Sequence, residues 1–164
     1  MSVSTGEQPI ERRARPRPPR ESRRQAREAA LQMLYQWEVG HTSIAEVVQT
    51  FWTIGPAADT PLSPPLQAFA VTLARGVVEH LEGIDPYLTA SAEHWRLSRM
   101  AVMDRLILRV AVYEFLFERT TPPKVVINEA LELARTFSTD NAVRFINGIL
   151  DAIRRKLDDE DDAR

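Results

Sequence analysis

Residues 97–117 have the sequence LSRMAVMDRLILRVAVYEFLF, and this stretch decides the fold class. Its apolar residues recur at helical spacing, and further apolar residues fall on nearly every other face of the helix. A helix of this kind is surrounded by other helices, so we expect it at the centre of the core. Arg105 and Arg109 lie one turn apart, which predicts a narrow stripe that reaches solvent or a partner. Arg109 and Glu114 also interrupt the stretch, which excludes a membrane span.

Two helices are predicted before this stretch. Ser22 and Gln25 have the spacing of a capping box, and Gly40 suits a C-terminal cap, so the first helix is expected between them. A second, shorter helix is expected at about residues 44–52. Residues 55–65 contain four prolines and a glycine, a density of helix breakers that no helix tolerates. This segment is therefore predicted to be a connector.

The same pattern continues along the rest of the chain. Apolar spacing predicts a helix from about residue 69 to Gly83, and Pro86 opens another short one. Thr121 followed by proline is typical of a helix start, and residues 138–140 provide caps for a final helix that ends at Leu157. We count about seven helices and no convincing strand, so the expected fold class is all-α.

Composition limits the class of protein further. A length of 164 residues, with 44% hydrophobic and 27% charged residues, suits one ordinary folded domain. The absence of cysteine excludes a disulfide scaffold, a thiolate nucleophile and zinc sites that need sulfur. The basic N-terminus lacks the apolar segment of a secretory signal peptide, so we expect a cytoplasmic protein.

Charge is distributed unevenly along the chain. Residues 1–27 contain eight arginines and three glutamates, whereas residues 158–164 contain five acidic residues and one arginine. We therefore divide the chain into a disordered Arg/Pro-rich arm (1–21), a helical domain (22–157) and an acidic tail (158–164). Basic arms often bind nucleic acid, and acidic tails act as solubilisers or as internal competitors for a basic site.

No constellation of catalytic residues is found. His41, His80 and His94 are isolated, which argues against a metal site. The six glycines are scattered, so neither a phosphate-binding loop nor a dinucleotide fingerprint can be assembled. Glu129 and Glu132 are interpreted as solvated surface charges. We predict no catalytic residue, no cofactor and no metal.

Four arginines at the start of the first predicted helix share one stripe. They are Arg20, Arg23, Arg24 and Arg27. The positive end of a helix dipole disfavours cations by about 0.3–1 kcal/mol each, so these arginines require a reason for their position. A phosphate backbone would supply it. The alternative is that they form salt bridges with Glu21, Glu28 and the acidic tail.

A second unusual surface lies at the start of the last predicted helix. Asn141, Arg144 and Phe145 fall outside its apolar face. An exposed Phe145 beside an arginine and an amide would stack on an unpaired base. The alternative, that Phe145 packs against a neighbouring helix, is equally favoured by the pattern.

Five segments of the chain, in the same order, resemble signatures of the NusB family of transcription antitermination factors. They are RRQARE (23–28) running on to LYQW (34–37), DPYL (85–88), LRVAVYE (108–114), VINEA (126–130) and FINGIL (145–150). The resemblance covers about residues 22–157. It implies two three-helix groups and no catalysis.

The resemblance also implies partners and contact residues. Family members bind the boxA element of nascent ribosomal RNA together with NusE, a small-subunit ribosomal protein, and help RNA polymerase in the elongation complex to pass terminators. Carried over to this sequence, the RNA-contact residues are Arg23, Arg24, Arg27, Tyr87, Asn141, Arg144 and Phe145, and the NusE-contact residues are Tyr35 and Asp104. Some relatives form homodimers that cover the RNA surface, and the sequence leaves that state open here.

The chain departs from the family pattern in three places. Gln25 interrupts the arginine run, the basic arm is longer than in short relatives, and the acidic tail has no clear counterpart. Two other functions are alternatives to this one. One is a helical protein-interaction module that is indifferent to RNA sequence. The other is the helical domain that occurs fused to RNA-modifying methyltransferases, but this chain has no room for the catalytic half.

Overall fold

The computed structural model describes residues 22–92 and 96–164, and over these ranges the regular secondary structure is entirely helical. The basic arm predicted for residues 1–21, with Arg20, lies outside the described residues. The elements in chain order are α1 (Arg23–Gly40), α2 (Ile44–Thr50), α3 (Pro56–Asp59), α4 (Pro64–Glu79), α5 (Leu81–Ser91), the 3-10 segment η1 (Leu97–Arg99), α6 (Val102–Phe117), α7 (Pro123–Phe137) and α8 (Asp140–Asp162). The all-α prediction is confirmed. Within the described ranges, no helix combines the length and apolar character needed to cross a membrane.

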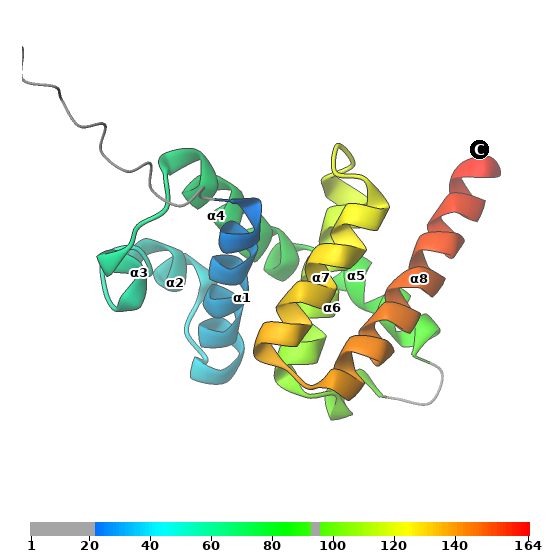
Figure 1. Ribbon diagram of the computed structural model, residues 1–164, viewed down its shortest axis with the longest axis horizontal. Coiled ribbons are helices and arrows are strands. Elements are labelled where there is room, and N and C mark those ends of the chain that lie inside the picture. Colours follow the sequence, from blue (N-terminus) through cyan, green and yellow to red (C-terminus); the bar gives the residue numbers. More distant parts are fainter. Residues whose placement is uncertain (1–21, 93–95) are drawn as a thin grey trace, which may run out of the picture.

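The helices form two groups, with α1–α4 on one side of the molecule and α5–α8 on the other (Figure 1). Helix α6 contacts α1 and α4 of the first group, and α5, α7 and α8 of the second. Every residue from Leu106 to Phe115 is buried, so this helix is covered on all its faces. The expectation of a central helix is therefore confirmed.

Charged residues on α6 are paired with neighbouring helices. Arg105 binds Glu38 of α1, and Arg109 binds Asp85 of α5 through two bonds of 2.9 Å. Only 8% of Arg109 is exposed. The expected stripe toward solvent or a partner is therefore wrong for Arg109, because a guanidinium buried this far has to find a carboxylate within the fold.

The ends of α1 follow the sequence closely. The capping box is present, and the Ser22 backbone N–H donates to the Gln25 side chain at 2.9 Å. At the other end, Gly40 is still helical and His41 takes the left-handed conformation, with φ at 52°. The helix therefore ends one residue later than the glycine signal indicates.

Several prolines of the described residues begin helices and do not separate them. Pro64 starts α4 and Pro123 starts α7, where the missing N–H would have no helical partner in any case. The predicted connector therefore gives way to α4 at residue 64, and α3 also lies within it. Helix α4 ends at Glu79 rather than Gly83, and Pro86 lies inside α5 at the loss of one backbone hydrogen bond.

The last helix is longer than expected. Thr139 caps its start by accepting a hydrogen bond from the Ala142 backbone at 3.2 Å, as predicted. Its other end passes Leu157 and continues through the acidic segment to Asp162. The helical domain and the acidic tail are therefore joined by one continuous helix.

Candidate nucleic-acid interface

A cleft of about 580 Å³ lies at the N-terminal end of α1. Arginines of α1 line one side, and the connection between α6 and α7, with Thr120 and Thr121, lines the other. Val125 of α7, which is 43% exposed, adds an apolar surface. The cleft thus combines cations, hydroxyl groups and an apolar wall, which are the groups that contact phosphates, riboses and bases.

Arg23 and Arg24 are the exposed cations of this cleft. The Arg23 guanidinium carbon lies 4.5 Å from the centre of the Phe69 ring of α4, which holds the side chain by a cation–π contact. Arg24 donates from Nε and Nη2 to the Glu129 carboxylate, at 2.9 and 3.1 Å. Its side chain remains 45% exposed. Both arginines are therefore held in place and remain open to solvent.

The arginine stripe has two interpretations, phosphate binding and internal salt bridges, and the pairing of Arg24 decides between them only in part. The arginine does form a salt bridge, with Glu129 and more distantly with Glu132, both on α7. Of the acidic residues named in the alternative, Glu21 lies outside the described residues. The interpretation of Glu129 as a solvated charge is wrong, since its side chain is 15% exposed and bound to Arg24. This hydrogen bond holds the pKa of Glu129 below its ordinary value, although burial works against it.

Arg27 has a different environment. Its side chain is 4% exposed and donates through two bonds, at 2.9 and 2.7 Å, to Glu114 of α6, whose side chain is 2% exposed. Its guanidinium carbon also lies 5.5 Å from the Phe69 ring. The charge of Arg27 is therefore matched inside the fold, at the floor of the cleft.

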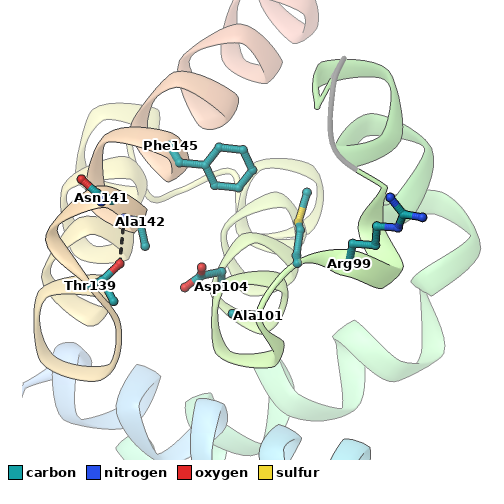
Figure 2. A pocket seen from close by; sticks show the side chains of 8 residues that line it. Arg99, Ala101, Asp104, Thr139, Asn141, Ala142 and Phe145 are labelled. Atoms are coloured by element: carbon teal, nitrogen blue, oxygen red, sulfur yellow. Dashed lines mark hydrogen bonds between the residues drawn. The ribbon is translucent and has the colours of Figure 1, made fainter.

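A second pocket, of about 280 Å³, lies at the start of α8. Phe145 of α8 and Asp104 of α6 both face this space, and Arg99 borders it from η1 (Figure 2). Phe145 is half-buried and packs partly against the core, so each of its two predicted placements holds for a part of the ring. Asn141 also lines the pocket, while Arg144 is exposed on α8.

Asp104 is held in a fixed position in this pocket. It lies in the first turn of α6, where a carboxylate is favoured by the helix dipole, and it accepts a hydrogen bond from the Ser138 hydroxyl. Tyr35, the other residue matched to a protein contact, is 43% exposed on α1. The structure therefore places Asp104 in the same pocket as Asn141 and Phe145. The family resemblance assigns Asp104 to NusE, whereas it assigns Asn141 and Phe145 to RNA.

Tyr87 of α5 lies against the last turns of α8. Its hydroxyl donates to Glu160 at 3.0 Å, and the Lys156 ammonium lies 5.5 Å from the centre of its ring. Burial, and then the bond to Glu160, raise the pKa of Tyr87 above its ordinary value. The Tyr87 hydroxyl is thus already engaged within the chain.

The predicted RNA residues do not form one patch. The start of α1 and the start of α8 lie at opposite edges of the molecule (Figure 1). Sequence spacing places residues on a helix face but cannot show how far apart two helix starts are. It also missed Phe69, Thr121 and Val125, for which only the position of Thr121 before a helix start gave a signal. Within the described residues, no group of acidic and histidine side chains suits a metal ion.

These features define a class, an all-helical protein with a cationic cleft at the start of its first helix. The NusB family model matches residues 24–155. The transcription antitermination protein NusB of Koribacter versatilis (strain Ellin345) is 46% identical over 139 residues, which cover 85% of this chain and 92% of that protein. The chain therefore belongs to the NusB family.

Solved structures agree with this assignment. NusB of T. maritima matches with a TM-score of 0.73 and 34% identity, over 82% of this chain and 92% of that one. A chain from the crystal structure of the antitermination factors NusB and NusE in complex with dsRNA matches with a TM-score of 0.71 and 25% identity, over 82% and 96% of the two chains. The two-group helical arrangement is that of the family.

Proposed function

We propose that this chain is an antitermination factor that binds the boxA element of nascent ribosomal RNA together with NusE. In this role it helps RNA polymerase in the elongation complex to pass terminators in ribosomal RNA operons. The carrying observation is the cationic cleft, in which Arg23 and Arg24 are fixed and exposed. A relative solved with NusE and dsRNA supports the choice of partners. The protein acts by binding and not by catalysis, at nascent transcripts in the cytoplasm.

Each residue receives a role in this proposal. Arg23 and Arg24 contact phosphates, and Arg24 exchanges the Glu129 carboxylate for a phosphate of similar geometry. Arg27 is a positioning residue, because its guanidinium is bound to Glu114 and holds α1 against α6. Arg20, which lies outside the described residues, is assigned a further phosphate contact.

The remaining residues contact bases and protein. Tyr87 and Phe145 stack on bases that are not paired, with Asn141 and Arg144 beside Phe145. Tyr35 and Asp104 contact NusE. Because the cleft and the α8 pocket lie at opposite edges of the molecule, the ligand has to be an extended strand and not a single nucleotide.

The test is fluorescence anisotropy of labelled boxA RNA against a scrambled RNA, with and without NusE, at several salt concentrations. We expect tighter binding to boxA, and a further increase when NusE is added. Each phosphate neutralised on a single strand contributes a slope of about −0.7 in log K against log salt, so the Arg23→Ala/Arg24→Ala variant should lose about 1.4 from this slope. Arg75→Ala, an exposed arginine on α4 outside the cleft, is the control.

Two results would contradict the proposal. An unchanged slope in the double variant would remove the cleft arginines from the interface. Equal affinity for boxA and scrambled RNA, with and without NusE, would favour the helical protein-interaction module instead.

A further inference from the structure

The C-terminal end of α8 is rich in acidic residues, and the helix dipole disfavours negative charge at this end of a helix. Residues 158–162 are all acidic, and negative charge in the last turn of a helix is unfavourable. Two contacts to other elements stabilise this end. Glu160 accepts the Tyr87 hydroxyl bond, and Asp161 pairs with Arg119 of the α6–α7 connection at 3.2 Å. The acidic end is therefore fastened to two groups that suit an anion.

A small cavity of about 130 Å³ lies beside the pair of Arg119 and Asp161. Arg119, Arg154 and Thr121 line it together with Asp158 and Asp161. The Thr121 hydroxyl and the Arg154 Nε are buried, and within the described residues neither has a hydrogen-bond partner. Unpartnered buried donors are costly, and a phosphate oxygen would satisfy them.

This cavity adjoins the arginine cleft. Thr121 lines both, and Pro122 and Pro123 border one each. The start of α1, the α6–α7 connection and the end of α8 lie at the same edge of the molecule (Figure 1). An RNA strand that leaves the cleft past Thr121 therefore meets Arg119 next.

We propose that Arg119, Arg154 and Thr121 form a second phosphate-binding position for RNA, which the acidic end of α8 occupies as an internal competitor until RNA displaces it. This inference rests on the proposed function. A carboxylate offers an arginine two acceptor oxygens, as a phosphate does, so Asp161 fills the place of a phosphate at Arg119. RNA binding releases both Asp161 and Glu160, and it frees Tyr87 for stacking in the same step.

The test compares two charge-matched variants of the full chain in the anisotropy titration. Glu160→Gln/Asp161→Asn removes the two anchoring carboxylates. Asp159→Asn/Asp162→Asn removes the same formal charge from the same turns but leaves the contacts to Tyr87 and Arg119 in place. We expect the first variant to bind labelled boxA RNA several-fold more tightly than the second.

A third variant tests the binding position itself. Adding Arg119→Ala to Glu160→Gln/Asp161→Asn should abolish the gain in affinity. Equal gains in the two charge-matched variants would overturn the proposal, because they would reflect net charge alone. A gain that survives the loss of Arg119 would overturn it as well.

The outcome is separable from that of the proposed function. Equal affinity of the unmodified chain for boxA and scrambled RNA contradicts the function, whereas the difference between the charge-matched variants can be scored on either RNA. An absorbance titration of tyrosine checks the contact in the free protein. Glu160→Gln should lower the pKa of Tyr87 toward its ordinary value, and burial retains a part of the shift. An unchanged titration would contradict the contact.

Discussion

Arg23 and Arg27 lie one helical turn apart on α1, yet their environments are opposite. Arg23 is exposed above the Phe69 ring, whereas Arg27 is buried against Glu114. Both guanidinium groups lie near the Phe69 ring of α4, and the difference comes from α6, which brings the Glu114 carboxylate to Arg27. One arginine is therefore available to a ligand and the other stabilises the fold.

Replacing Arg27 should destabilise the protein strongly. Arg27→Met leaves the Glu114 carboxylate buried without a counter-charge, which costs about 3–5 kcal/mol in the free energy of unfolding. Urea denaturation at neutral pH measures this loss. The double variant Arg27→Met/Glu114→Leu should recover most of it, since it removes both charges. A loss below about 1 kcal/mol, as expected for an exposed ion pair, would contradict the structural role.

Packing between elements depends on one glycine. A Cβ atom built on Gly76 of α4 would lie 2.2 Å from ring atoms of Tyr113 on α6. The absence of a side chain at this position is what allows the tyrosine ring to lie directly against α4. The close approach of α4 and α6 at this point therefore depends on the small Gly76 lying opposite the large Tyr113.

Gly76→Ala should lower the melting temperature, because overpacking of a core costs about 1–3 kcal/mol. The matched control is Gly83→Ala on α5, where a Cβ meets nothing within 4 Å. That change should stabilise the protein by up to about 1 kcal/mol through helix propensity. Thermal unfolding followed by circular dichroism distinguishes the two. Equal effects would mean that α4 and α6 adjust freely at this crossing.

The helices were predictable because their apolar spacing is a local signal. The capping box at Ser22 and the cap at Thr139 were predictable for the same reason, since each satisfies a backbone donor within a few residues. Pairs across the fold were not. Glu129 and Arg24 are 105 residues apart in the chain, and nothing in the sequence indicates that α7 lies beside the start of α1. The sequence therefore predicts the cleft arginines, but not the residues that they contact, Glu129 and Phe69.

At the scale of the molecule, one buried phenol (Tyr113) and one half-buried phenol (Tyr87) make the free energy of unfolding depend on pH in the alkaline range. Burial is the main cause that raises the pKa of Tyr87 and of Tyr113 above the ordinary value of 10.0. Because the pKa of each phenol is higher in the folded than in the unfolded protein, the neutral phenol contributes to stability in full below pH 10. This contribution is lost as the pH rises through the pKa values of the folded state. The free energy of unfolding should therefore fall at alkaline pH.

Urea denaturation across the alkaline range tests this dependence. The variant Tyr87→Phe/Tyr113→Phe should show a flatter fall than the unmodified chain, because it has no phenol to ionise at these two positions. A fall of the same steepness in both proteins would assign the alkaline loss to other groups.

The pairing of Arg27 with Glu114 also bears on how the protein is made. The two residues are 87 positions apart, so the first helix leaves the ribosome long before its counter-charge is synthesised. Until α6 follows, α1 can pack against α2 and α4, but the arginine on its buried face lacks its carboxylate partner. The N-terminal half consequently has to wait for the rest of the chain, and products of interrupted translation that stop before α6 are incomplete chains for proteases to remove. The protein reaches its native core late in its own synthesis.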